Sequence, residues 1–326
     1  MVHRTMRLCT LTVAITSVFT LSAPLAQAGE PWPQRPVRVI TPFAAGTDGA
    51  ARPFAEQLGK RWKQPVVIEN RPGAEGLIGA SAFTSMRDDH TLFYYSAAAI
   101  TTLPLTHRKL PYDPARDLVP ISSAIDAALA ISVSTSLNIS SLSMLVSLAR
   151  AEPGKLNYYP VNGGSFMIVL PAFVKSEGLD MVHVSYREAS LGMQDAVAGR
   201  VHVVMTSVAT ALPLVRSGKL RMLALTNRHR FPLVAEVPTA IEAGYPQLSF
   251  DGLQGFFGPR DMPPERRERI AADVRAAAAE PIVADPLASI GLVARGSTPA
   301  EFATAIEAQR VDLAALAKLI GLKPEH

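Results

Sequence analysis

The sequence predicts an α/β protein with two successive blocks of alternating strands and helices. Three observations support this fold class. β-rich runs alternate with amphipathic stripes, turn-forming residues separate them, and 48% of the 326 residues are hydrophobic against 18% charged. This composition is that of a globular protein with a buried core, and it excludes a largely disordered or polyelectrolyte chain. The alternation favours parallel strands that are joined by crossover helices.

The first block begins with a β-rich run at residues 37–40, which turn-forming residues 42–49 follow. Apolar side chains then recur every three or four positions across residues 51–62, and this spacing predicts an amphipathic helix. The remaining elements of the block are expected as a strand at 66–68, a helix at 77–86 and a strand at 91–95. The order strand, helix, strand, helix, strand is typical of a parallel sheet.

The second block begins near residue 125. A strand is expected at 128–133, and a helix whose apolar face includes Leu142 and Val146 ends at Pro153-Gly154. Further strands and helices are expected at residues 156–159, 166–176, 182–185, 191–198, 201–206 and 220–226. Near the end of the sequence, apolar residues from Phe302 to Ile320 repeat in steps of three and four, which predicts a long helix packed on a sheet.

Residues 1–28 have the layout of a secretory signal peptide. Basic Arg4 and Arg7 precede an apolar run that ends at Leu21, and Ala26-Gln27-Ala28 precedes Gly29. The apolar run is shorter than the roughly 20 residues of a membrane span, although a single N-terminal anchor is the alternative. We expect cleavage after residue 28 and export of the remaining chain.

The sequence lacks the patterns that are typical of catalytic, metal and cofactor sites. It contains no G-x-S-x-G, H-E-x-x-H or G-x-x-x-x-G-K motif, and its histidines are scattered without ligand spacing. Cys9 is its only cysteine, which excludes a disulfide framework and a cysteine-based metal site within one chain. The formal net charge of +4 is spread thinly, without the basic runs of a nucleic-acid-binding protein. We therefore expect no enzyme activity, no metal, no cofactor and no nucleic-acid partner.

Two turns, one in each block, lie between an expected strand and the start of an expected helix. Helix starts present free backbone N–H groups that suit a carboxylate, and small residues let a ligand approach closely. The alternative is an ordinary turn in which Asp48 and Ser165 cap their own helices. One such turn in each block favours a ligand site between two lobes. The candidate residues are Ala44, Ala45, Gly46, Thr47 and Asp48 in the first turn and Asn162, Gly163, Gly164 and Ser165 in the second.

Several short motifs follow one another along nearly the whole chain after the leader. They are Trp32-Pro33-Gln34-Arg35-Pro36-Val37, Val66-Val67-Ile68-Glu69-Asn70-Arg71-Pro72-Gly73, Lys109-Leu110-Pro111-Tyr112-Asp113-Pro114, Pro153-Gly154-Lys155-Leu156-Asn157-Tyr158, Asp180-Met181-Val182-His183-Val184, Gly218-Lys219-Leu220-Arg221 and Glu236-Val237-Pro238-Thr239. Each motif is short, but the whole set in this order is specific to one protein family. Through them the chain resembles the substrate-binding receptors of tripartite tricarboxylate transporters, the Bug family of periplasmic solute-binding proteins.

The resemblance implies a two-lobed type II periplasmic binding protein fold with a ligand cleft between the lobes. Lobe 1 would comprise residues 29–124 and 251–326, and lobe 2 residues 125–250. It implies a periplasmic monomer that captures a small carboxylate, amino acid or amide and delivers it to membrane permease subunits. The two turns correspond to the ligand loops of the family. Ser96 and Tyr186 would also face the cleft, and with Thr206 they would add hydroxyl groups.

The chain departs from the family pattern at the expected ligand site. Its first loop is shorter than usual, and Glu75 and Glu188 stand where glycine is common. Pro53 and Pro171 fall early in the two ligand helices, where proline is expected to interrupt them. We therefore expect a monocarboxylate, a zwitterion or a neutral polar ligand rather than a citrate-like polyanion. Two alternatives stay open, namely a ligand sensor that signals to a partner without transport and an enzyme on the same scaffold.

Overall fold

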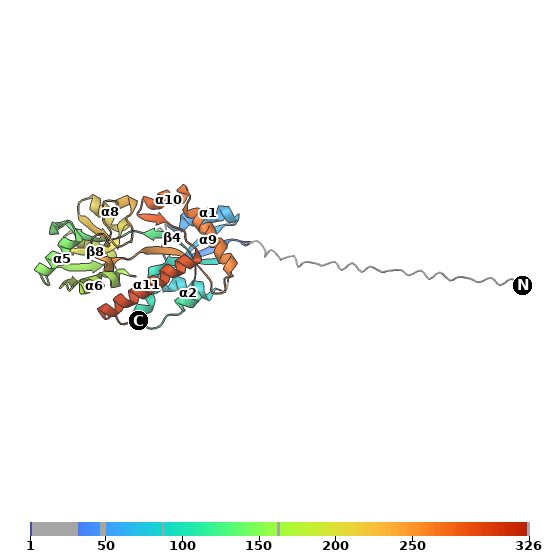
Figure 1. Ribbon diagram of the computed structural model, residues 1–326, viewed down its shortest axis with the longest axis horizontal. Helices are drawn as coiled ribbons and strands as arrows, with labels where there is room; N and C mark the ends of the chain where they lie inside the picture. The colour runs from blue at the N-terminus through green and yellow to red at the C-terminus, as the bar shows by residue number, and fades with distance from the viewer. Residues whose placement is uncertain (2–31, 46–49, 87, 162–163, 325–326) are drawn as a thin grey trace. The chain divides into compact units, whose positions relative to one another are not determined.

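Two β-sheets, each flanked by helices, organise the chain in a computed structural model (Figure 1). The structure describes residues 1, 32–45, 50–86, 88–161 and 164–324, and residues 32–326 form one unit. In the first sheet, strand order is β11-β4-β10-β3-β1-β2, and in the second it is β7-β6-β8-β5-β9. The predicted α/β fold class with two blocks is confirmed.

The first sheet contains the predicted parallel unit. β1 pairs in parallel with β2 and with β3, and α1 and α2 provide the crossovers. β10 is antiparallel to β3 and β4, and β11 is antiparallel to β4, so the sheet as a whole is mixed. The bounds are β1 Val37–Thr41, α1 Ala51–Trp62, β2 Val66–Asn70, α2 Leu77–Ser85, β3 Thr91–Ser96, β4 Val119–Ala127, β10 Gly252–Gly258 and β11 Leu292–Ala294.

The second sheet is also mixed. β6 is parallel to β7 and β8, whereas β5 is antiparallel to β8 and β9 because the chain enters this sheet through β5 from the other one. The bounds are β5 Leu129–Ser134, α5 Leu142–Ala151, β6 Asn157–Pro160, α6 Phe166–Ser176, β7 Val182–His183, α7 Ala189–Val197, β8 Val203–Ser207, α8 Val208–Arg216 and β9 Leu220–Leu225.

The chain crosses between the sheets twice, and the two crossings are hydrogen-bonded to each other. The Asn227 amide donates to the Ala127 carbonyl (2.9 Å) and accepts from the Leu129 N–H (2.9 Å), so the returning segment is tied to the outgoing one. The division predicted at residues 124 and 125 falls inside β4, whose pairing with β10 continues to Ala127. The change of sheet therefore comes at Ala128, where this pairing ends.

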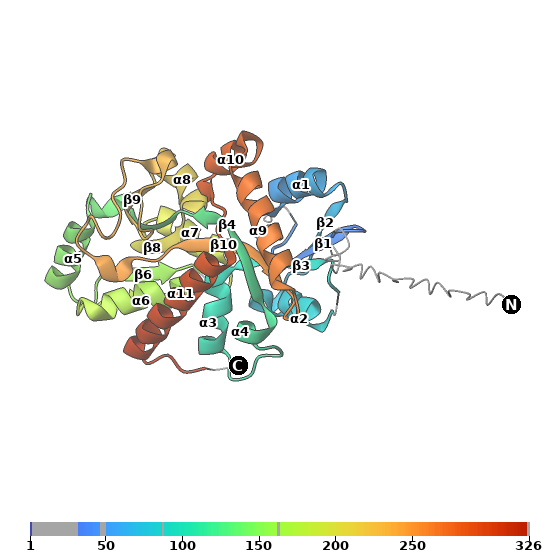
Figure 2. The same ribbon diagram turned by 45° about the vertical axis from the view of Figure 1, so that its right-hand side comes forward.

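The long helix predicted near the end of the sequence is α11, Pro299–Ile320. Thr298 and Glu301 form a capping box at its start, and Gly321 ends it with φ 72°. It packs against α6 and α3 (Ala97–Thr106) as well as against β4, as Figure 2 shows, so helices share the burial that was expected from a sheet. The other helices are α4 Pro114–Asp117, α9 Pro264–Ala278 and α10 Pro281–Ala288.

Pro53 and Pro171 do not interrupt their helices, and this prediction was wrong. Pro53 is the third residue of α1, in the first turn, where backbone N–H groups have no acceptor within the helix. Pro171 is the sixth residue of α6, and six of the eleven residues of that helix are buried. Their packing offsets the one hydrogen bond that proline removes.

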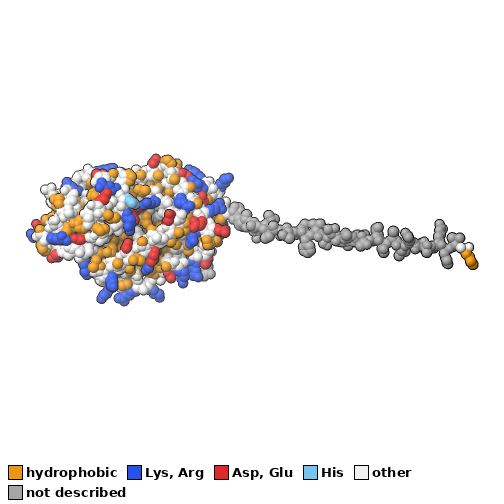
Figure 3. Space-filling view, viewed as in Figure 1, with side chains coloured by type: hydrophobic (Ala, Val, Ile, Leu, Met, Phe, Trp, Pro, Cys, Tyr) orange, Lys and Arg blue, Asp and Glu red, His pale blue; other side chains and the backbone are white. Residues whose placement is uncertain are grey.

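Within the described ranges, no helix has both the length and the apolar character required to cross a bilayer. On the face drawn in Figure 3, basic and acidic side chains are interspersed.

Candidate functional site

A cavity of about 500 Å³ lies where segments of both sheets meet. Tyr95 and Ser96 at the end of β3, and Ser207 at the end of β8, contribute to its lining. The first residues of α3 and α6 contribute as well. The cavity is thus lined by residues at strand ends and helix starts, the positions at which α/β proteins bind ligands.

Ser96 connects β3 to α3 at this cavity. It is the N-cap of α3, and its Oγ accepts from the Ala99 N–H at 3.4 Å. Thr102 lies one turn further along α3 and also lines the cavity. Its side chain is 4% exposed, and Oγ1 has no hydrogen-bond partner among the described residues. Buried hydroxyl groups are normally paired, so Thr102 offers the cavity an unused polar group.

The start of α6 provides the second-lobe side of the cavity through Gly164, Ser165 and Phe166. Ser165 is the N-cap of α6 and is 4% exposed, yet its hydroxyl makes no capping bond. The alternative in which this side chain caps its own helix is therefore not what the structure shows. Gly164 has φ 63°, a left-handed conformation that favours glycine.

A strained turn places Glu75 at the cavity. Ala74 and Glu75 have φ 47° and 52°, and they lie between Gly73 (φ 118°) and Gly76 (φ 93°). The Tyr95 hydroxyl donates to the Glu75 carbonyl at 2.6 Å and so holds the turn against β3. Glu75 contributes to the lining, whereas Glu188 is an exposed residue at the start of α7 and does not. The two glutamates that depart from the family pattern are thus not equivalent.

The first predicted turn is only partly described. Ala44 and Ala45 are exposed, and their neighbour Phe43 lines the cavity. Gly46, Thr47 and Asp48 lie outside the described residues, as do Asn162 and Gly163 of the second turn. The N-cap of α1 is Ala50, with no side-chain capping bond. The interpretation of Asp48 as the residue that caps α1 falls outside the described residues and stays a prediction.

Tyr186 and Thr206 lie near the second sheet, outside the lining of the cavity. The Tyr186 hydroxyl donates to Asp195 Oδ2 at 2.5 Å, and its ring packs edge-on against Tyr159. Partial burial, with this hydrogen bond, raises the pKa of Tyr186 to about 12. Thr206 is buried within β8, and the next residue, Ser207, lines the cavity. Consecutive residues of a strand point to opposite faces, which explains this difference.

Gln254 and Phe250, which no sequence pattern indicated, also line the cavity. Gln254 lies in β10 and accepts from the Tyr94 hydroxyl at 3.1 Å. The run Gly252–Gly258 contains three glycines, a composition that favours turns over strands. They are needed for close pairing, since a Cβ on Gly252 would lie 2.5 Å from the Ala127 carbonyl oxygen.

The lining is mainly apolar and carries a single negative charge. Among the described lining residues there is no Lys, Arg or His, and Glu75 is the one residue that is charged at neutral pH. Polar groups come from five hydroxyl residues and one amide, namely Tyr95, Ser96, Thr102, Ser165, Ser207 and Gln254. Backbone N–H groups at the starts of α3 and α6 add donors that suit an anionic or polar ligand group.

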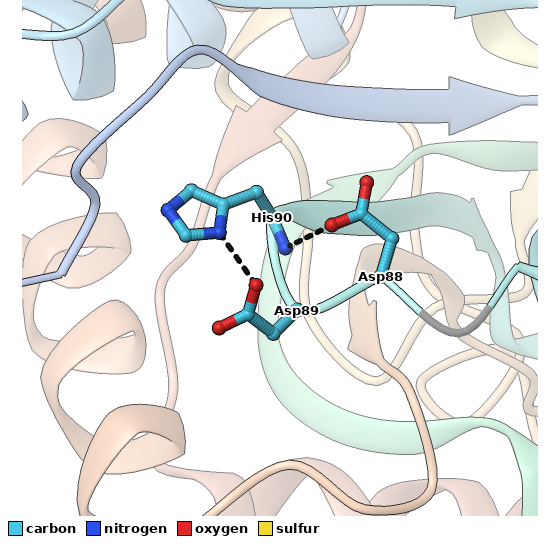
Figure 4. Close-up of side chains that lie close together, drawn as sticks. All are labelled: Asp88, Asp89 and His90. Carbon is cyan, nitrogen blue, oxygen red and sulfur yellow. Dashed lines mark hydrogen bonds and ion pairs between the residues drawn. The ribbon is translucent and has the colours of Figure 1, made fainter.

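A larger hollow of about 760 Å³ lies between the end of α2, α4 and the start of α9, and none of the predicted site residues that the structure describes lines it. Asp88 and Asp89 do, and with His90 they bring potential metal ligands within 4.8 Å of one another (Figure 4). Arg35 and Arg38 contact Asp88 at 2.5 and 3.0 Å, and Arg266 contacts Asp89 at 2.8 Å.

These contacts determine the charge state of Asp88. Partial burial would raise the pKa of the Asp88 carboxyl group, but hydrogen bonds from Arg35, the His90 N–H, Thr91 and Arg38 hold that pKa well below its usual range. The carboxylates of this hollow are thus already neutralised by arginine. At the smaller cavity, by contrast, the Glu75 carboxylate has no arginine or lysine partner among the described residues, so this cavity is the candidate functional site.

Comparison with known proteins identifies relatives along nearly the whole chain. Residues 50–321 match the family model of the tripartite tricarboxylate transporter family receptor. The chain is 29% identical over 316 residues to a UPF0065 protein of Bordetella bronchiseptica, in an alignment that covers 94% of this chain and 92% of that protein.

Solved structures agree with this match. Rpa4515 of R. palustris, solved with adipate, is 30% identical, has a TM-score of 0.77, and aligns with 90% of this chain and all of its own. The periplasmic binding protein BugD is 23% identical, with a TM-score of 0.72 over 90% of this chain and all of its own, which shows the fold alone. The predicted two-lobed periplasmic binding protein fold is confirmed.

Proposed function

The chain belongs to the tripartite tricarboxylate transporter receptor family, and from this we propose that it captures a small carboxylate or related polar metabolite in the periplasm and delivers it to a membrane transporter. Members of this family are receptors that bind solutes rather than enzymes. The expectation of a binding protein, in place of an enzyme on the same scaffold, is therefore confirmed.

The cavity between the two sheets carries the proposal for this chain. Its volume of about 500 Å³ lies within the range of small-molecule sites. The starts of α3 and α6 both reach it, and each supplies a serine, Ser96 and Ser165. N–H groups at two helix starts can hold carboxylate oxygens. That a relative was solved with adipate, a dicarboxylate, supports this class of ligand.

The two crossings between the sheets support a receptor that closes around its ligand. Asn227 bonds the segments at Ala127 and Leu129, so that bending is restricted to a short region between the lobes. Hinges in binding proteins consist of a few residues at the ends of such elements. We propose that the exported protein begins at Gly29 and acts as a monomer.

The first test is a thermal-shift and calorimetric screen of the exported protein after its ligand has been stripped by unfolding and refolding. The probes are mono- and dicarboxylates, amino acids and amides. We expect at least one probe to raise the midpoint of unfolding and to bind with a Kd in the micromolar range or tighter. Ser165→Ala should weaken that ligand by about tenfold, because a buried hydrogen bond to a charged group is lost.

Ser190→Ala is the matched control, because Ser190 is exposed at the start of α7 and lies outside the cavity. It should leave binding unchanged. If no probe binds, or if both serine variants lose the ligand equally, the cavity is not the receptor site. Binding without any effect of a transporter deletion on uptake would favour the ligand sensor instead.

A further inference from the structure

We infer that Glu75 selects the ligand by its charge, and that this receptor takes a solute with a protonated nitrogen, of the ω-amino carboxylate class, in preference to a dicarboxylate. The inference rests on the proposed function, since it concerns the same cavity. It assigns the specificity of that cavity to one side chain.

The first observation is the isolation of the Glu75 charge. Its carboxylate makes no hydrogen bond or ion pair with any residue that the structure describes, and no cation is among the described lining residues. Two other acidic side chains of the first lobe, in contrast, are paired with arginine. Glu69 contacts Arg71 at 2.6 Å, and Asp88 contacts two arginines. Glu75 therefore presents the cavity with a negative charge that the protein does not neutralise.

The second observation is the backbone that carries this charge. Four non-glycine residues of the described chain have positive φ, and two of them, Lys63 and Asn138, occupy the ends of helices, where this conformation is ordinary. Ala74 and Glu75 are adjacent, and neither terminates an α-helix. Strain of this kind persists where the surrounding structure enforces it, and it clusters at ligand sites.

The surrounding structure holds the strained backbone of Ala74 and Glu75 in place. Tyr95 is 6% exposed and its hydroxyl donates to the Glu75 carbonyl at 2.6 Å. Burial raises the pKa of Tyr95 further above its ordinary value, which is already well above physiological pH, so the hydroxyl is a proton donor there. A Cβ on Gly76 would lie 2.2 Å from the same oxygen, so the turn fits closely against the tyrosine. Glu75 is thus held at the cavity by a fixed backbone.

The remaining lining restricts the ligand further. Phe43, Leu103, Phe166 and Phe250 suit an apolar chain, while Ser96 and Ser165 at two helix starts suit one carboxylate. A second carboxylate would find no cationic partner among the described lining residues and would be repelled by Glu75. A protonated amine in its place would be attracted. At about 4 Å, in an environment between water and a dry interior, a pair of charges changes affinity by roughly tenfold to a hundredfold.

The test compares ligands of equal length that differ at one end. Calorimetric titration of stripped protein with 6-aminohexanoate, adipate and hexanoate, and with the corresponding four-carbon series, isolates the terminal charge. We expect the amino carboxylate of at least one series to bind about tenfold or more tightly than the dicarboxylate. Glu75→Gln should remove that preference and strengthen dicarboxylate binding.

Glu188→Gln is the control, because it removes a glutamate of the same kind outside the cavity, and it should change neither ligand. Equal or tighter binding of the dicarboxylate by the wild type, with no change in Glu75→Gln, would overturn the inference and leave the proposed function intact. If no member of either series binds to the wild type or the variants, the carboxylate receptor itself is contradicted, and this inference with it.

Discussion

The two turns that bound the cavity differ in almost every physical property. The turn at Gly73–Gly76 is strained, is fixed by the Tyr95 hydroxyl, and carries the charge of Glu75. The start of α6 carries no charge: its left-handed residue is Gly164, for which φ 63° has no steric cost, and Ser165 has helical geometry and makes no capping bond. The difference indicates a division of roles: the second-lobe turn supplies general hydrogen-bond donors, and the first-lobe turn discriminates between ligands.

The largest expected effect on stability comes from Asp126, an acidic residue next to the outgoing crossing at Ala127. Its behaviour can be compared with that of Glu75. Burial, with the nearby charge of Asp251, raises the pKa of Asp126 to about 7, against smaller opposing effects of Arg295, the Gly252 N–H and Asn227. The folded state therefore binds a proton that the unfolded state releases. We expect the free energy of unfolding to fall as pH rises from about 4 to about 7, by up to about 4 kcal/mol.

Urea denaturation at several pH values measures this dependence. Asp126→Asn should flatten it, whereas Glu75→Gln should not, since Glu75 is exposed. If Glu75→Gln also removed the slope, the charge of Glu75 would be coupled to folding, and its assignment to ligand selection alone would fail.

A pair of glycine variants tests the next largest effect. Gly76→Ala should destabilise the protein by about 3 kcal/mol, because φ is 93° and the new Cβ would lie 2.2 Å from the hydroxyl oxygen of a buried tyrosine. Gly164→Ala should cost only about 1 kcal/mol, because φ is 63° and the new Cβ meets nothing within 4 Å. Similar costs in denaturant titrations would contradict the view that only the first turn is held rigidly.

Removing one hydroxyl group from each turn should produce a smaller difference in stability between the two variants. Tyr95→Phe leaves the Glu75 carbonyl without its donor and should reduce the free energy of unfolding by about 1 to 2 kcal/mol. Ser165→Ala removes no capping bond and should change stability by less than about 0.5 kcal/mol, although it weakens ligand binding. Thermal unfolding without ligand distinguishes the two, and a large loss for Ser165→Ala would show a structural role that the geometry does not predict.

The sequence predicts the elements of this fold where amphipathic spacing is strong. The stripe at residues 51–62 coincides with α1, and the helix expected at 166–176 coincides with α6. It misses β10 because three glycines suggest a turn, although they allow close pairing with β4. It misses α3 because six of its ten residues are buried and no polar face marks its period.

The site was predictable only in part for a related reason. Gly164 and Ser165 follow from their place between an expected strand and an expected helix, whereas Ser96 was expected from the family resemblance alone. Glu75 lines the cavity because of a left-handed turn, which neither propensity nor periodicity detects. Thr206 was expected at the cavity, but its neighbour Ser207 lines it. Side chains alternate between the two faces of a strand, so an error of one residue in the expected position selects the wrong face.

The smallest difference expected between two paired variants concerns the strain itself. Glu75→Gly should raise the free energy of unfolding by about 0.5 to 1 kcal/mol, since glycine adopts φ 52° without steric cost and loses part of that gain through greater freedom in the unfolded chain. Lys63→Gly is the matched variant, because Lys63 has φ 53° at the end of α1 and does not line the cavity. Both variants should be more stable by similar amounts in denaturant titrations. Only Glu75→Gly should lose the preference for an amino carboxylate, because it alone removes the charge at the cavity. Such a result would mean that this chain retains a less stable backbone at one turn because the charge there provides selectivity. Unchanged selectivity in Glu75→Gly would contradict the proposed difference in role between the two turns.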